Sequence, residues 1–246
     1  MTAYEGIHCG CDVEASDARS AALVSRRRML GGALAGAAAS AVAGAELAMP
    51  SIARAQTVKS ADEALKALVE GNRRFVDRKL TFYQEDLTIL QQNTAEKQEP
   101  FASVLSCADS RVPVELLFDQ SIGHVFVNRV AGNIVTSEIL ASIEYGAAVL
   151  GTKVIMVLGH GNCGAVKATI DGKAVPGQIS SLYRFIRPAV NAAGDNLRAA
   201  TEANAKIQAQ LLKESSPVLA GLLKDGKLSV VAAFFDVENG KVTLLS

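Results

Sequence analysis

Residues 154–164 read Val-Ile-Met-Val-Leu-Gly-His-Gly-Asn-Cys-Gly, and this stretch is the strongest indication of the fold class. Its first five residues are continuously apolar, which is typical of a strand covered by helices on both faces. Gly159 and Gly161 permit a tight turn directly after the strand, and Cys163 then lies near the start of a helix. The stretch therefore predicts a strand–turn–helix unit, the repeating element of α/β proteins.

A second stretch has the same order of features. Residues 101–106 form a short apolar run and end at Cys107, and residues 125–127 form a third, shorter run. Residues 228–235 and 241–245 flank Asn239-Gly240, a strong signal for an antiparallel hairpin. We predict an α/β fold with a mainly parallel β-sheet flanked by helices and an antiparallel edge strand at the C-terminus.

The predicted helices follow from apolar positions at helical spacing. The first follows a capping box, in which Ser60 precedes Glu63 by three residues. Another is stopped by Gly151, and one carries Pro188 in its last turn. The helices are expected at residues 61–78, 84–92, 137–150, 178–190 and 196–213.

Composition limits the class of protein. The chain has 246 residues, of which 49% are hydrophobic, so it can form one substantial core. Its 25 basic residues equal its 25 acidic residues, and it has no tryptophan. Neither a charge excess nor a set of base-stacking aromatics therefore points to a nucleic-acid partner.

Residues 1–55 have the pattern of a bacterial export signal. Ser25-Arg-Arg-Arg-Met-Leu30 opens a run rich in alanine and glycine, and Ala53-Arg-Ala55 resembles a cleavage site. Adjacent arginines indicate the twin-arginine route. We expect cleavage after Ala55, a single catalytic domain at residues 56–246, and a periplasmic or otherwise exported protein. The alternative is an uncleaved membrane helix, in which Glu46 would be costly; the export signal is the only membrane contact expected.

Four residues in two clusters form a candidate metal site: Cys107, Asp109, His160 and Cys163. Two thiolates, an imidazole and a carboxylate suit tetrahedral zinc. Both clusters follow predicted parallel strands, at the sheet edge where α/β proteins bind ligands. The alternatives are a Cys107–Cys163 disulfide, or a buried histidine and cysteine in a glycine-rich turn.

Asp109 has two possible partners. It can bind the metal and close the site, or it can pair with Arg111 through two parallel hydrogen bonds and leave the fourth position to water. A simple salt bridge in a turn is the alternative interpretation of this pair.

Three motifs together resemble the β-class carbonic anhydrases: Cys107-Ala-Asp-Ser-Arg111, Arg129-Val-Ala-Gly-Asn133 and Gly159-His-Gly-Asn-Cys-Gly-Ala-Val166. The resemblance implies one Zn²⁺ per subunit and reversible hydration of carbon dioxide to bicarbonate and a proton. It also implies a homodimer or higher homo-oligomer that exchanges N-terminal helices.

The resemblance further assigns roles to single residues. Asp109 and Arg111 would be catalytic. Gln98 would hydrogen-bond substrate at the neighbouring subunit's site, and Phe126, Val130 and Tyr145 would form the apolar wall of the substrate pocket. For Phe126 and Val130, an ordinary core position is the alternative.

Three questions remain open at this point. His124 is the one histidine of the predicted mature chain outside the ligand set, so it is a candidate proton shuttle or a structural residue. The same ligands also resemble those of enzymes that hydrolyse carbonyl sulfide or carbon disulfide. A zinc-binding assembly protein without turnover is the non-enzymatic alternative.

Overall fold

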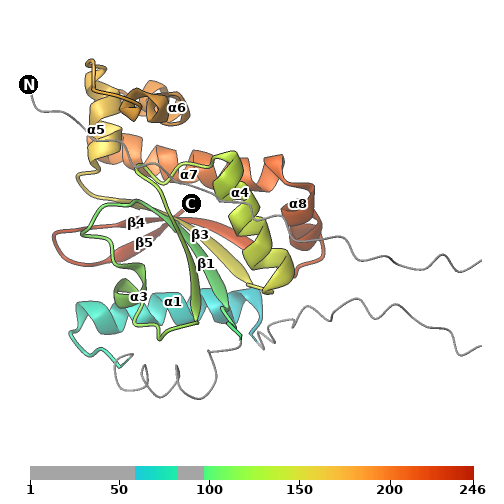
Figure 1. Cartoon of the computed structure of the whole chain (residues 1–246). Helices are drawn as coiled ribbons and strands as arrows, with labels where there is room; N and C mark the ends of the chain where they lie inside the picture. Colours follow the sequence, from blue (N-terminus) through green and yellow to red (C-terminus); the bar gives the residue numbers. More distant parts are fainter. Residues whose placement is uncertain (1–58, 82–96) are drawn as a thin grey trace, which may run out of the picture. The chain divides into compact units, whose positions relative to one another are not determined.

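The computed structural model describes residues 59–81 and 97–246, and this part of the chain contains a five-stranded sheet (Figure 1). The strand order is β2-β1-β3-β4-β5; the first four strands are mutually parallel and β5 pairs antiparallel with β4. The predicted α/β class and the antiparallel C-terminal edge strand are confirmed. The strands are β1 (Ala102–Ser106), β2 (Val125–Arg129), β3 (Val154–His160), β4 (Ser229–Phe235) and β5 (Val242–Leu245).

Helices lie on both faces of the sheet (Figure 1). The helices are α1 (Ala61–Val76), α3 (Val114–Leu117), α4 (Ser137–Glu144), α5 (Gly164–Asp171), α6 (Tyr183–Ala193), α7 (Leu197–Ser215) and α8 (Pro217–Lys224). A π-helical turn, Tyr145–Val149, continues α4, and a 3₁₀ turn, Ile179–Leu182, precedes α6.

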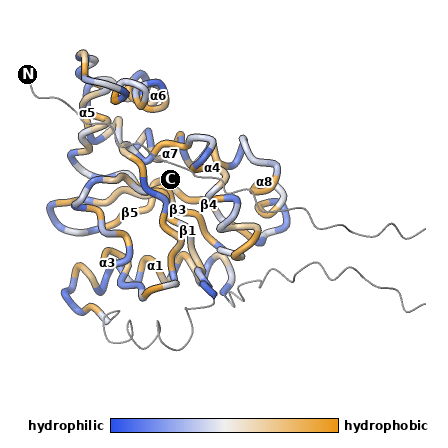
Figure 2. The backbone as a smooth tube through the Cα atoms, in the orientation of Figure 1, coloured by the Kyte–Doolittle hydropathy of each residue, from blue (hydrophilic) through white to orange (hydrophobic). Residues whose placement is uncertain are grey.

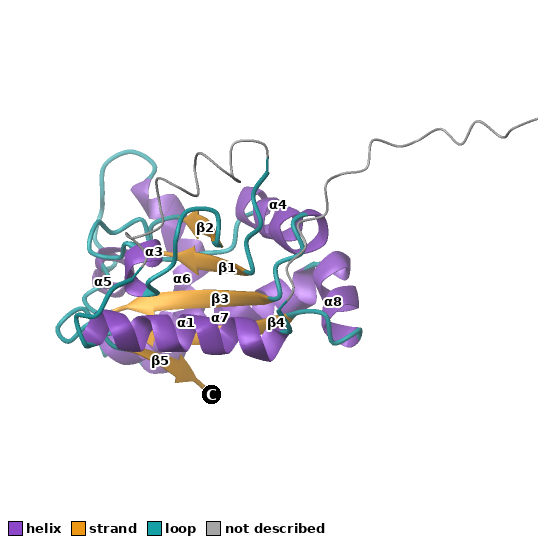
Figure 3. Cartoon of the chain, turned by 90° about the horizontal axis from the view of Figure 1, so that it is seen from below, coloured by secondary structure: helices purple, strands orange, loops and turns teal. Residues whose placement is uncertain are grey.

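The two faces of the sheet bury different residues because side chains alternate along a strand. Val104 and Met156 pack with α1, whereas Leu105 and Ile155 pack with α4, α7 and α8. Figure 2 shows apolar residues along β1 and β3, and Figure 3 shows α1 lying across the sheet face. The central strands are therefore buried on both sides, as their continuous apolar sequence predicts.

Helix α1 is held at both of its ends. The predicted capping box at Ser60 is present, with both reciprocal hydrogen bonds to Glu63. Near its other end the buried Asn72 amide donates to the Gly240 carbonyl at 2.9 Å and accepts from the Val242 N–H at 2.8 Å. One side chain thus fixes the β4–β5 hairpin to α1.

Several predicted elements differ in detail. The helix expected at 137–150 changes to a π-helical turn at Tyr145, although it ends before Gly151 as predicted. Pro188 lies in the middle of α6 rather than in its last turn, because that helix starts later and continues to Ala193. Helices α3 and α8 were not predicted; α8 follows a Ser216 cap and begins with a proline.

Two predictions, the helix at 84–92 and the export signal at 1–55, lie outside the described residues. Among the helices that are described, none is both long and apolar enough to cross a bilayer.

Candidate metal centre

The two sequence clusters meet at the carboxyl edge of the sheet. Cys107 follows β1, His160 ends β3, and Cys163 caps the N-terminus of α5. Their ligand atoms all lie within 4.8 Å of one another, and all three side chains are buried. The prediction that these residues converge is confirmed, and both cysteines are free thiols rather than a disulfide.

The His160 imidazole presents an unpaired nitrogen to this cluster. Its Nδ1 lies 2.9 Å from the Gly161 carbonyl oxygen, so Nδ1 carries the proton and donates it. Its Nε2 is buried and has no hydrogen-bond partner among the described residues. A buried polar atom without a partner is costly, and here it lies with two sulfurs. This donor set fits zinc.

The pKa values of the two cysteine thiols are shifted in opposite directions. The Cys163 thiol donates to the Cys107 sulfur, and the adjacent His160 ring and the Gly132 and Asp109 backbone also favour the thiolate, so the pKa of Cys107 falls to about 4. The same bond, together with burial, raises the pKa of Cys163 well above its ordinary value. A thiolate is therefore already favoured at one ligand position.

Asp109 lies against Arg111 in the structure. The Arg111 Nε and terminal nitrogen donate to the two carboxylate oxygens at 2.9 and 2.8 Å, and the Arg111 backbone N–H donates at 2.9 Å. These bonds hold the pKa of Asp109 well below its usual range. The nearer carboxylate oxygen lies 3.9 Å from the His160 Nε2. Asp109 thus faces the cluster while paired with Arg111, and its role as a fourth ligand stays a prediction.

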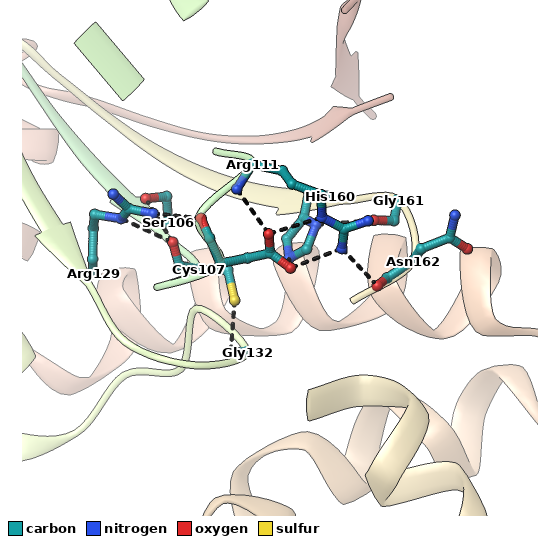
Figure 4. Close-up of polar contacts among 9 residues, drawn as sticks. Ser106, Cys107, Arg111, Arg129, Gly132, His160, Gly161 and Asn162 are labelled. Atoms are coloured by element: carbon teal, nitrogen blue, oxygen red, sulfur yellow. Dashed lines mark hydrogen bonds and ion pairs between the residues drawn. The ribbon is translucent and has the colours of Figure 1, made fainter. Parts of the chain in front are cut away.

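Arg111 and Arg129 connect the turns of the site through hydrogen bonds (Figure 4). Arg111 also donates to the Asn162 carbonyl at 3.2 Å and so links the turn after β1 to the turn after β3. Arg129 donates to the Cys107 carbonyl at 3.0 Å and to the Asp109 carbonyl at 2.6 Å. Arg129 was part of a quoted motif, but nothing in the sequence indicated this backbone contact.

A backbone donor reaches one of the sulfurs. The Gly132 N–H donates to the Cys107 Sγ at 3.3 Å, as Figure 4 shows. Gly132 has φ of +78°, and a Cβ there would lie 2.7 Å from the Ile186 Cδ1. A side chain at this position would therefore strain the backbone and displace the Ile186 side chain.

The expected pocket residues separate into two groups. Val130 packs against the apolar cluster that contains Cys107, so it lies beside the ligands. Phe126 and Tyr145 instead form a ring pair, with centroids 6.2 Å apart. Phe126 pairs with Ser103, four residues before Cys107 in β1. Four residues of strand span roughly 13 Å, so Phe126 lies about that far from Cys107 along the sheet.

Gln98 and His124 lie at the other end of the sheet. Gln98 is exposed and precedes β1, whereas Cys107 follows β1. His124 immediately precedes β2 and contacts the Phe101 ring, at a centroid distance of 6.3 Å. Neither residue meets the metal ligands within one chain, which disfavours direct proton transfer by His124 within a subunit.

Comparison with known proteins agrees with this geometry. The family model described as carbonic anhydrase matches residues 102–242. Carbonic anhydrase 2 of Mycobacterium tuberculosis is 33% identical over 189 residues, covering 74% of this chain and 91% of the relative. A carbonic anhydrase of Mycolicibacterium smegmatis is 35% identical and covers 74% of this chain and 92% of its own length. The solved structure of a Coccomyxa β-carbonic anhydrase with acetazolamide has a TM-score of 0.59 at 29% identity, covering 74% of this chain and 86% of that one.

Proposed function

The chain is an enzyme of the β-carbonic anhydrase family, and we propose that it catalyses the zinc-dependent, reversible hydration of carbon dioxide to bicarbonate and a proton. One zinc ion per subunit would be held by Cys107, His160 and Cys163. The observation that carries this assignment is the unpaired, buried Nε2 of His160 beside two sulfur atoms.

The zinc ion would supply Lewis acidity that lowers the pKa of a water molecule, a property for which carbonic anhydrase is itself the standard example. Asp109 would accept a hydrogen bond from that water at a carboxylate oxygen and so orient it toward the carbon of carbon dioxide. Arg111 keeps this carboxylate ionised and holds it in place. Water and carbon dioxide give bicarbonate, and the released proton passes to buffer.

We propose that the complete site needs a second subunit. Gln98 lies before β1 and the ligands lie after it, so roughly 16 Å of strand separates them in one chain. A Gln98 side chain from a neighbouring subunit would hydrogen-bond a substrate oxygen. Tyr145 is 47% exposed beside the edge strand β2, where a partner would cover it. Phe126 and Val130 would complete the apolar wall.

Export by the twin-arginine route remains part of the proposal. It rests on the sequence of residues 25–30 and 53–55. Changing Arg26 and Arg27 together to lysine should retain the protein in the cytoplasm, measured by cell fractionation. N-terminal sequencing of the exported protein should begin at Gln56. Equal export of the variant would refute the twin-arginine assignment.

The test of the function is zinc content together with stopped-flow carbon dioxide hydration. We expect one zinc per chain and rapid hydration, with carbonyl sulfide and carbon disulfide hydrolysed far more slowly. Faster turnover of a sulfur compound would assign the chain to that hydrolysis instead. Zinc-loaded protein that turns over none of these three compounds would favour the alternative of a zinc-binding assembly protein.

A further inference from the structure

Helix α7 carries two amide side chains on the face that it buries. Asn204 and Gln208 are 0% and 1% exposed, one helical turn apart, and Gln208 Nε2 donates to Asn204 Oδ1 at 3.3 Å. Burying amides is costly unless their hydrogen bonds are made. Leucine or alanine would serve packing against the sheet better, so these two amides call for an explanation in terms of what they bind.

Both amides bind backbone groups of the loop at residues 130–135. Asn204 Nδ2 donates to the Gly132 carbonyl at 2.8 Å, and Gln208 Oε1 accepts from the Val135 N–H at 2.8 Å. Gln208 Nε2 also donates to the Phe185 carbonyl at 3.1 Å. A carbonyl needs a donor and an N–H needs an acceptor, so the backbone fixes the orientation of each amide.

The loop needs this external support. Gly132 and Asn133 both have positive φ, +78° and +42°, and the second is an unusual conformation for a residue with a side chain. The Asn133 side chain is fully buried, yet neither of its polar atoms has a hydrogen-bond partner in the part of the chain that the structure describes. The side chain of Asn133 therefore does not hold the loop through hydrogen bonds.

Gly132 connects this helix to the metal ligands. Its carbonyl is held by Asn204, and its N–H donates to the Cys107 Sγ at 3.3 Å. We propose that Asn204, braced by Gln208, is a positioning residue of the metal centre. It fixes Gly132 so that its N–H stays on the Cys107 sulfur. This inference deepens the proposed function and rests on zinc binding at Cys107, His160 and Cys163.

The physical consequence concerns the sulfur atom. An N–H bond occupies one lone pair of a thiolate, directs the remaining lone pairs toward the other ligands, and withdraws charge from the sulfur. Outer partners that orient metal ligands in this way typically change metal affinity by about 10- to 100-fold when removed. Withdrawal of charge also raises the energy of thiolate-to-metal charge transfer, which is visible when cobalt replaces zinc.

The test compares the full chain with its Asn204→Ala variant. Zinc affinity is measured by competition with a chromogenic chelator, and the near-ultraviolet charge-transfer band is measured with cobalt(II). The matched control is Thr201→Val on the same buried face of α7. The Thr201 hydroxyl donates to the Leu197 carbonyl within the helix, and its methyl group lies close to Gly159. Valine keeps that methyl contact and leaves the loop anchors intact.

We expect Asn204→Ala to weaken zinc binding by about 10-fold or more and to move the cobalt band to longer wavelength. Thr201→Val should leave the cobalt band and the zinc affinity unchanged, and its only expected effect is a lower thermal stability. Gln208→Met breaks the brace and the Val135 bond, so it should shift both readouts in the same direction by less. If Asn204→Ala does not fold, the same two measurements on Gln208→Met test the inference instead.

Three results overturn the inference. The first is a folded variant that loses stability while its cobalt band and zinc affinity match the wild type, since the amides would then be structural only. The second is an equal shift in Thr201→Val. The third is a wild-type chain that binds neither metal, which refutes the proposed function and the inference with it. The first two leave the proposed function standing.

Discussion

Replacing Asp109 by asparagine is the sharpest test of the catalytic geometry. The carboxylate receives three N–H bonds from Arg111 and points one oxygen toward the His160 Nε2, 3.9 Å away. Asparagine has nearly the same shape, but its amide nitrogen must face one of these donors. The variant therefore loses a charged acceptor and turns a hydrogen bond into a repulsive contact, while the Cys107, His160 and Cys163 donors remain.

The size of the effect follows from the role proposed for the carboxylate. A well-placed general acid or base contributes about 10²- to 10⁴-fold in rate. The Asp109 side chain is 18% exposed, so water can partly replace it. We therefore expect the lower end, about 10²-fold in kcat/KM, which is about 2.7 kcal/mol of barrier. Zinc content should stay at one per chain.

The assay is stopped-flow hydration with a pH indicator, with metal content measured on the same sample. The control is Asp236→Asn, because Asp236 also follows a parallel strand of the sheet, is 24% exposed, and forms its ion pair with Arg198 rather than with Arg111. It should keep nearly full activity. Asp109→Asn with full zinc and a rate within about threefold of wild type would remove Asp109 from the mechanism, since general-acid–base groups contribute far more than that.

Three further predictions concern metal, stability and pH. Cys107→Ser should lose most bound zinc, and a chelator should lower the Tm of the wild type but not of this variant, because only the wild type is stabilised by bound metal. Gly71→Ala should destabilise the fold by about 3 kcal/mol in urea unfolding, because the new Cβ would lie 1.7 Å from the Phe118 carbonyl oxygen; a loss below about 0.5 kcal/mol would contradict this packing. Arg111 lowers the folded-state pKa of Asp109, so the stabilisation is complete above the unfolded value, about 4, and is lost as the pH falls below it. The Tm difference between metal-free wild type and Arg111→Gln should therefore be constant down to about pH 4 and shrink below it; a difference that grows there would reverse the sign of the linkage.

The sequence predicted those features that depend on residues close together in the chain. The apolar run at 154–158 gave a central strand, and the positions of Cys107 and His160 after two such runs predicted their convergence. The turn at Asn239-Gly240 predicted the edge hairpin. The change to a π-helical turn at Tyr145 was not predicted, and this turn packs closely on a strand that is distant in the sequence. A Cβ at Gly146 would lie 2.7 Å from the Ser103 Oγ, a residue of β1.

The hydrogen bonds between side chains and the backbone of the site were not predicted, for a related reason. Arg129, Asn204 and Gln208 act on backbone atoms, and a backbone atom has the same chemistry at every position. Helical spacing places Asn204 and Gln208 on the inward face of α7, but no local pattern says that the Gly132 carbonyl lies opposite. Only the folded sheet brings residue 204 to residue 132.

The short ligand motifs are therefore insufficient for a metal centre. Gly132, Asn133 and Asn162 all have positive φ in the turns around the ligands, and such conformations persist only where neighbouring structure holds them. Arg111 holds the Asn162 carbonyl and Asn204 holds the Gly132 carbonyl, each across more than 50 residues of sequence. Cys107, His160 and Cys163 supply the donor atoms, whereas the arginines and α7 fix where those atoms point. The proposed zinc site therefore depends on the whole sheet edge and its covering helix, since the same three ligands without those anchors would lack fixed directions.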